Sequence, residues 1–198
     1  MQIKKIESKK DIEKRERKNQ LAIGLILISI MILSTAGYAF ERTKQEKKIY
    51  KDVVFINDEK GFWTSEKLGT ATKFLPQEVN GINGSILISK SSVQEKVFYF
   101  DAFSSNEFTA ANEIASNLLP SKTQQVCIEG EENKEGCENL PIKSCSDERL
   151  GTYIFIFKSE ENSTLNLEKK DNCLFFNGGE ESLIKAADKF IFMINNVF

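Results

Sequence analysis

Histidine is absent from this sequence, and its absence excludes several kinds of chemistry. Ser-His-Asp hydrolases, Cys-His hydrolases, histidine-ligated metal sites and histidine acid–base catalysis all require an imidazole side chain. An enzyme with this sequence would have to use carboxylates, lysine, serine or cysteine. We therefore expect no catalytic residues, no metal and no cofactor, and keep a carboxylate-dependent hydrolase as the enzymatic alternative.

Close cysteine pairs are also missing. The four cysteines lie at positions 127, 137, 145 and 173, and none forms a CxxC motif. Zinc ribbons and thiol redox motifs need such pairs, so structural disulfides in an exported domain are the better interpretation. Three pairings are possible, and proximity along the chain favours Cys127 with Cys137 and Cys145 with Cys173. Four reduced thiols are the alternative for a domain that faces the cytoplasm.

Basic residues are in the minority over most of the chain. Residues 1–51 hold 13 basic and 6 acidic side chains, whereas residues 52–198 hold 14 basic and 23 acidic ones. The first part has a net charge of +7 and the second of −9. Affinity for nucleic acid rests largely on Lys and Arg that meet phosphates, so we expect no nucleic-acid partner.

One long run without charge stands between two basic segments. Leu21 to Phe40 contains no charged residue, and a helix of that length spans about 30 Å, the thickness of the hydrocarbon core of a bilayer. Its few polar residues form no charged face, which excludes an amphipathic surface helix. We expect this run to cross the membrane, with the lipid bilayer as its partner.

The basic flanks predict the orientation of this helix. Eight basic residues precede the run, and five follow it before residue 52. Basic residues are retained in the cytoplasm, so the N-terminus is expected there and the acidic part outside, at the cell membrane. Two sequons, which begin at Asn83 and Asn162, agree with export. The expected segments are a cytoplasmic leader at 1–20, a transmembrane helix at 21–40, a juxtamembrane stalk at 41–51 and an extracytoplasmic domain at 52–198.

The same run has two other interpretations. Gly37-Tyr38-Ala39 has the small-residue spacing of a signal peptidase site, but the leader and the apolar run are longer than in most signal peptides. Lys18-Asn19-Gln20 before the apolar helix suggests a leader of the type IV pilin kind, which would make the protein a filament subunit. Pilin-like proteins usually carry a Glu near the fifth mature position, and Leu21 to Leu25 contains no acid.

Short β-branched and aromatic runs after Asp52 predict strands. DVVFIN, GFWTS and ATKFL suggest an antiparallel meander, followed by strands at 85–89 and 96–103. Ser104 and Glu107 have capping-box spacing, and apolar residues then recur at helical intervals until Pro120. A strand at 125–130 would complete a βαβ unit with parallel strands.

The C-terminal part predicts further strands and a closing helix. A polar loop at 129–146 holds two of the cysteines, and TYIFIFK reads as a buried strand. TLNLEK and CLFFNG suggest a hairpin, and a helical stripe from Leu183 to Val197 should pack on the sheet. The predicted fold class is α/β (α+β), with one transmembrane helix before a mixed β-sheet domain that contains the βαβ unit and the C-terminal helix.

The junction after the strand at 96–103 is the candidate ligand site. In open α/β sheets, ligands collect at the carboxyl ends of strands, beside helix N-termini. The residues at this junction are Asp101, Ser104, Ser105 and Asn106. The competing structural interpretation makes Ser104 a helix cap and Asp101 a turn former. Paired acids such as Asp101 with Asp147, or Asp171 with Asp188, could also meet in space.

The C-terminal half carries a family resemblance. Its features are KVFYFDAF, VCIEG, LPIKSCSDE, TYIFIF, NCLFFNG and the helix SLIKAADKFIFMINNV. It resembles an uncharacterised group of archaeal single-pass membrane proteins with an exported α/β domain. The resemblance implies a location and an architecture and brings no activity with it. We expect a non-enzymatic, membrane-anchored extracytoplasmic module that binds another envelope or membrane protein or a surface ligand.

Overall fold

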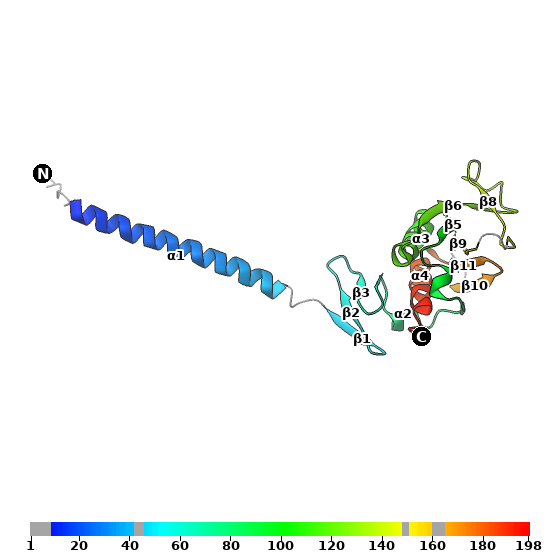
Figure 1. The fold of residues 1–198 in the computed structure, drawn as a ribbon, viewed down its shortest axis with the longest axis horizontal. Helices are drawn as coiled ribbons and strands as arrows, with labels where there is room; N and C mark the ends of the chain where they lie inside the picture. The colour runs from blue at the N-terminus through cyan, green and yellow to red at the C-terminus, as the bar shows by residue number, and fades with distance from the viewer. Residues whose placement is uncertain (1–8, 42–45, 148–150, 160–164) are drawn as a thin grey trace. The chain divides into compact units, whose positions relative to one another are not determined.

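The computed structural model describes residues 9–41, 46–147, 151–159 and 165–198 (Figure 1). The chain divides into two compact units, and the boundary in the sequence lies between residues 45 and 46. The first unit contains a single helix, α1 (Lys9–Glu41), of 33 residues. The second unit contains all the strands and the other helices.

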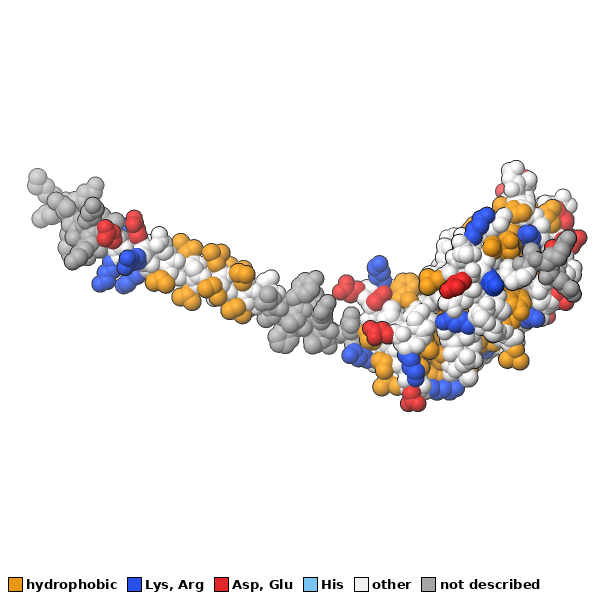
Figure 2. Space-filling view, viewed as in Figure 1, with side chains coloured by type: hydrophobic (Ala, Val, Ile, Leu, Met, Phe, Trp, Pro, Cys, Tyr) orange, Lys and Arg blue, Asp and Glu red, His pale blue; other side chains and the backbone are white. Residues whose placement is uncertain are grey.

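The apolar side chains in the middle of α1 are exposed in this structure. Between Leu21 and Leu33 its large apolar side chains are 57–71% exposed, and Figure 2 shows apolar side chains along the visible face of the helix. Residues Glu13–Ser34 are long and apolar enough to cross a membrane. A helix that is apolar on all sides requires lipid or protein around it, so this segment is a membrane span or a signal sequence.

The second unit starts with an antiparallel sheet of four strands, as the meander prediction required. The strands, in sheet order, are β1 (Lys47–Tyr50), β2 (Val53–Asn57), β3 (Trp63–Ser65) and β4 (Thr70–Thr72). Strand β1 lies inside the segment that was expected to be a stalk. The third predicted strand, ATKFL, is shorter than expected, because the chain turns into helix α2 (Pro76–Val79).

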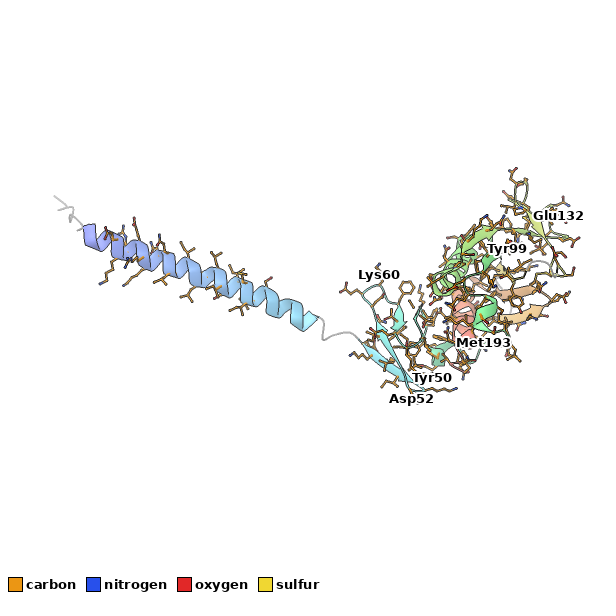
Figure 3. The ribbon with its side chains drawn as sticks, in the orientation of Figure 1. Tyr50, Asp52, Lys60, Tyr99, Glu132 and Met193 are labelled. Carbon is orange, nitrogen blue, oxygen red and sulfur yellow. A yellow bond between two sulfur atoms is a disulfide. The ribbon has the colours of Figure 1, made fainter. Side chains whose placement is uncertain are left out.

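A two-residue turn joins β1 to β2. Lys51 and Asp52 have φ angles of 43° and 63°, and Tyr50 pairs with Val53 on either side of them. Positive φ at both central residues is the pattern of a type I′ hairpin turn. Tyr50 and Asp52 mark this turn in Figure 3.

The larger sheet confirms the βαβ unit. Strand β5 (Val97–Asp101) leads through α3 (Ser105–Leu118) to β6 (Lys122–Gln125), which pairs with β5 in parallel. The returning strand therefore lies just before the predicted 125–130. Those residues form β7 (Cys127–Ile128), which pairs with β8 (Ile142–Lys143). The strand predicted at 85–89 is wrong: that segment is irregular and leads to a 3₁₀ turn, η2 (Lys90–Ser92).

The remaining elements follow the prediction. Strand β9 (Ile154–Ser159) lies beside β5 in parallel, and β10 (Asn166–Lys170) forms a hairpin with β11 (Cys173–Gly178). The sheet order is β10-β11-β9-β5-β6, and β11 is parallel to β9. Helix α4 (Glu180–Ile194) closes the fold. The α/β class with a mixed sheet and a packed C-terminal helix is confirmed.

Two different covers protect the faces of the larger sheet. Helices α3 and α4 pack on one face around a phenylalanine cluster, in which Phe155 and Phe176 contact the edge of Phe190. The other face, with Ile154 and Ile156, is covered by the segment that contains Val126 and Ile128. A mostly polar loop segment therefore covers the face of the sheet that a second layer of helices would otherwise cover. Such a segment has no helical hydrogen bonds to hold it in place, so other bonds must stabilise it.

Disulfides supply these bonds, and both predicted pairings are present. Cys127 is bonded to Cys137 with a Cα–Cα distance of 5.8 Å, and Cys145 is bonded to Cys173 at 5.1 Å. The first closes the loop above the sheet, and the second ties the end of this segment to β11. Disulfides persist in oxidising compartments, so two of them indicate an exported domain.

The smaller sheet packs on the C-terminal end of α4 and on α3. Phe55 contacts the ring of Phe192 edge to face, with a centroid distance of 5.9 Å. Asn117 of α3 pairs with the backbone of Ala71 on the outer edge of β4, accepting at 2.9 Å and donating at 2.8 Å. The free edge of β4 is thereby closed, which leaves no ladder for another strand there.

Candidate functional site

The two central parallel strands end at a topological switch point. The chain leaves β5 through α3 towards β6 on one side, whereas it leaves β9 through β10 towards β11 on the other side. In open α/β sheets the crevice at such a point is where ligands bind. Asp101 is the last residue of β5, and Ser159 is the last residue of β9.

Asp101 is fully buried at this point. Its Oδ1 accepts a hydrogen bond from Lys134 Nζ at 3.1 Å. Its Oδ2 is buried and has no hydrogen-bond partner among the residues that the structure describes. Burial raises the pKa of Asp101 above its ordinary value, and the neighbouring ammonium of Lys134 opposes that rise.

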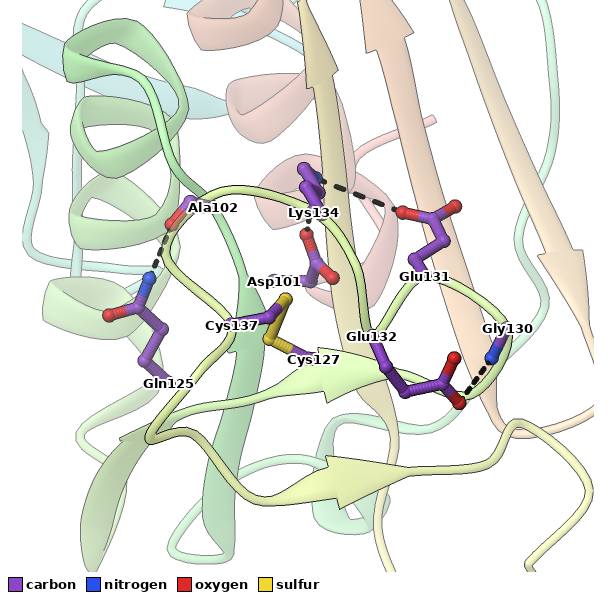
Figure 4. Close-up of a disulfide and its surroundings, with 9 residues drawn as sticks. All are labelled: Asp101, Ala102, Gln125, Cys127, Gly130, Glu131, Glu132, Lys134 and Cys137. Carbon is purple, nitrogen blue, oxygen red and sulfur yellow. Dashed lines mark hydrogen bonds and ion pairs between the residues drawn. A yellow bond between two sulfur atoms is a disulfide. The ribbon is translucent and has the colours of Figure 1, made fainter.

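Lys134 contacts three groups at once, and Figure 4 shows two of them, the carboxylates of Asp101 and Glu131. Besides Asp101, its Nζ lies 3.8 Å from a carboxylate oxygen of Glu131 and 4.2 Å from the ring centre of Phe103. Glu131 also accepts from Lys158 at 2.8 Å. The side chains of Lys134, Glu131 and Lys158 are each about one third exposed. A chain of alternating charges therefore runs from buried Asp101 to the surface.

The loop that carries Lys134 is compact. The Cys127–Cys137 disulfide closes it, and the backbone N–H of Lys134 donates to the carbonyl of Glu131 at 3.0 Å. Gly136 has a φ of 94° and lies so close to Phe103 that a Cβ there would be 3.0 Å from the ring. Glycine at 136 thus allows the loop backbone to approach the β5–α3 junction.

Glu107 fills the start of α3. Its carboxylate accepts from the backbone N–H groups of Phe103 at 2.7 Å, Ser104 at 2.9 Å and Ser159 at 3.0 Å. Burial raises the pKa of Glu107, but the three backbone hydrogen bonds together lower it by more. The net shift of the pKa is therefore downward. An acidic side chain of the protein thereby occupies the place where an anionic ligand would meet the helix start.

The predicted site residues have different surroundings. Ser104 is the helix cap, because its Oγ accepts from the backbone N–H of Glu107 at 3.3 Å. Ser105 is exposed and Asn106 half-buried in the first turn of α3. The structure therefore brings Asp101 and Ser104 to one junction and gives Ser104 a structural role. Lys134 was not predicted, although it is the single basic residue of the acidic segment 129–138.

Replacement of Glu107 by alanine should destabilise the domain by about 2 to 4 kcal/mol, because three backbone donors lose a charged acceptor. Chemical denaturation of the full chain in nanodiscs measures the loss. Ser104→Ala is the matched control, with an expected cost of about 1 kcal/mol for a lost cap. Equal losses in the two variants would contradict the bridging role of Glu107.

The close pair of acids is not one of those predicted. Asp171 lies on the exposed β10–β11 turn, whereas Asp188 is fully buried on α4 beside Glu113 of α3. Asp188 Oδ2 accepts from the backbone N–H of Phe74 at 2.8 Å. Burial and the charge of Glu113 raise the pKa of Asp188 to about 9, and burial also raises the pKa of Glu113.

This acid pair joins α3 and α4 to the backbone at Phe74. One oxygen of each carboxyl, Asp188 Oδ1 and Glu113 Oε1, is buried without a hydrogen-bond partner among the described residues. A proton between the two carboxyls would satisfy both oxygens, since like charges this close cannot both ionise. Because Asp188 has no access to solvent, the pair fits a structural joint better than a catalytic dyad.

No metal centre accompanies these clusters: within residues 9–41, 46–147, 151–159 and 165–198, no three His, Cys, Asp or Glu side chains are grouped to hold an ion.

Comparison with known proteins gives no family. No family model, no curated protein and no solved structure matches this chain. The resemblance to archaeal single-pass membrane proteins therefore stays a prediction. The N-terminal apolar helix and the two disulfides indicate a membrane-anchored or secreted extracytoplasmic protein.

Proposed function

We propose that this protein is a single-pass membrane protein whose domain, outside the cytoplasm, binds another envelope component and catalyses no reaction. The observation that carries the proposal is the partly exposed charge chain that joins the disulfide-closed loop to the β5–β9 switch point. The disulfide makes the loop rigid, and the loop presents charged side chains beside the buried carboxylate of Asp101. A rigid scaffold that presents charged groups is typical of a recognition site.

The anchor is supported by α1. Its large apolar side chains between Leu21 and Leu33 are exposed, and the basic excess before Leu21 favours a cytoplasmic N-terminus. The disulfides support an oxidising compartment for residues 46–198. Together they favour retention at the membrane with the domain outside.

The absence of catalysis is supported by the roles of the acidic side chains. The carboxylate of Glu107 accepts three backbone hydrogen bonds, and Asp188 is fully buried. Asp101 is paired with Lys134. A carboxylate-dependent hydrolase needs two close acidic side chains that reach a substrate. Glu107, Asp188 and Asp101 do not form such a pair.

Site-specific photocrosslinking in native membranes tests the proposal. A photoreactive residue is placed at Glu132, which is exposed on the loop, and a matched one at Glu66, which is exposed between β3 and β4. We expect a discrete crosslinked product from position 132 and none from position 66. Equal products from both positions, or none from either, would overturn the loop as the recognition surface.

The mature N-terminus distinguishes the anchor from a filament subunit. We propose that the leader stays attached, since Leu21 to Leu25 lacks the acidic residue that pilin-like proteins usually carry near the fifth mature position. Peptide mass spectrometry of the membrane-extracted protein should find leader peptides that precede Leu21. A chain that starts at or near Leu21 would instead support processing into a pilin-like filament.

A further inference from the structure

The ammonium of Lys134 lies in a cluster of groups that attract cations. Asp101 lies 3.1 Å away, Glu131 lies 3.8 Å away, and the face of Phe103 lies 4.2 Å from the Nζ atom. Carboxylates hold an ammonium through charge-assisted hydrogen bonds, and an aromatic face attracts it through the ring quadrupole. We call Asp101, Glu131 and Phe103 the ammonium cluster.

The cluster has hydrogen-bonding capacity that Lys134 leaves unused. Asp101 is fully buried, and its Oδ2 has no partner among the described residues. A buried carboxylate oxygen without a donor is costly, so an unpaired one in a native site calls for an explanation. A free ammonium group carries three donors and is not constrained by the geometry of a loop.

The cation and its carboxylate belong to different elements. Asp101 and Phe103 are fixed by the sheet and by the start of α3, whereas Lys134 is carried by the loop between the two bonded cysteines. Glu131 is held by Lys158 on β9, independently of Lys134. The lysine side chain is a third exposed, so it can leave while the cluster keeps its shape.

We propose that the ammonium cluster binds a primary alkylammonium group, such as a lysine side chain of an extracytoplasmic partner, and that Lys134 occupies the site until that group displaces it. This inference deepens the proposed function and rests on it for the identity of the partner. The acidic balance of residues 52–198, 23 acids against 14 bases, favours the approach of a cationic segment.

The test empties the cluster and refills it from solution. The Lys134→Met variant, as the full chain in nanodiscs, has an unbranched apolar side chain one atom shorter than lysine and lacks the cation. Thermal unfolding is followed while n-butylammonium chloride is added, with tetramethylammonium chloride as the ionic control that has no N–H donor. We expect butylammonium to raise the melting temperature of this variant with saturation, because a ligand of the native state stabilises it.

Two further variants show whether the effect belongs to this site. Asp101→Asn/Lys134→Met should lose the response to butylammonium. Lys143→Met is the matched control, because Lys143 lies 5.0 Å from the ring of Tyr99 and has no carboxylate partner among the described residues, and it should not gain a response. In the wild-type protein, butylammonium should shift the ¹⁵N signal of the Lys134 ammonium, at concentrations about tenfold higher than those that saturate Lys134→Met, because Lys134 competes.

The outcomes separate this inference from the proposed function. A response of Lys134→Met that equals that of the double variant, together with an unmoved Lys134 signal in the wild type, would overturn the ammonium site. If Lys134→Met fails to fold, the wild-type signal alone decides. Saturable butylammonium binding without a crosslink from position 132 would keep the site and overturn the binding module.

Discussion

Replacement of Asp188 by asparagine is expected to remove most of the pH dependence of stability between about pH 4 and pH 9. In the folded wild-type protein the pKa of Asp188 is raised from 3.8 to about 9, mainly by burial. The folded state therefore retains a proton that the unfolded state releases. The free energy of unfolding should fall as the pH rises through this window, by at most about 1.4 kcal/mol per pH unit for one proton.

Asparagine fits the site because, like a protonated aspartic acid, it has one hydrogen-bond acceptor and one hydrogen-bond donor group. Its Oδ1 can accept from the backbone N–H of Phe74, and its Nδ2 can donate to the carboxylate of Glu113. The variant should match the wild type near pH 5 and exceed it in stability near pH 8. Lys73, the cation that acts on Glu113, stays in place in both proteins.

Denaturation at a series of pH values measures the effect, and Glu113→Gln provides the control. That variant leaves Asp188 buried, and burial is the larger cause of its shift. Stability should therefore still fall with rising pH in Glu113→Gln. An Asp188→Asn protein that keeps the wild-type slope would show that Asp188 does not hold the proton.

Removal of the Cys145–Cys173 disulfide should have the second large effect. This bond joins residues 28 positions apart, and the entropy of loop closure predicts a loss of about 3 to 4 kcal/mol in Cys145→Ala/Cys173→Ala. The bond also holds the cover of the sheet face around Ile154 and Ile156. Its loss should loosen that cover as well as shift the unfolding midpoint.

Cys127→Ala/Cys137→Ala is the comparison for this prediction. Its bond spans only 10 positions, so the expected loss is smaller by about 1 kcal/mol. Guanidinium denaturation of both variants under non-reducing conditions gives the two values. A larger loss from the shorter loop would contradict the view that Cys145–Cys173 is the main brace of this face.

Local sequence signals predicted the elements whose cause is local. Ser104 and Glu107 form the capping box that their spacing indicated, and α3 begins immediately after Ser104. The β5–α3–β6 unit and the β10–β11 hairpin also followed from apolar runs and turns. Proximity along the chain sufficed for both disulfides, because each bond joins cysteines that are consecutive in the sequence.

Elements that depend on a neighbouring strand were less predictable. Strand β1 was missed because its turn uses Lys51 and Asp52, without the Asn-Gly or Asp-Gly signal of such hairpins. The apolar run at 85–89 has strand composition, but in the described part of the chain the bridge to the sheet lies just before it, at Asn83 with Asn166. A strand needs a partner along its length, and composition does not reveal whether one is available.

The candidate site was predictable only in its position. The end of a buried strand before a capped helix indicated Asp101, and the structure places it at the switch point. Its partner Lys134 follows 33 residues later in a loop without periodic pattern, so no local rule joins the two. Glu113 and Asp188 meet only because α3 and α4 pack on the same sheet face.

Lysine labelling of intact cells tests the central claim of an anchored domain outside the cytoplasm. A membrane-impermeant amine reagent is applied, and the modified lysines are identified by peptide mass spectrometry. Lys169 and Lys170 on β10 are exposed, as are Lys14 and Lys18 before the apolar run. We expect label on the first pair in intact cells and on the second pair only after permeabilisation. The reverse pattern, with the leader labelled and the domain protected, would contradict the account.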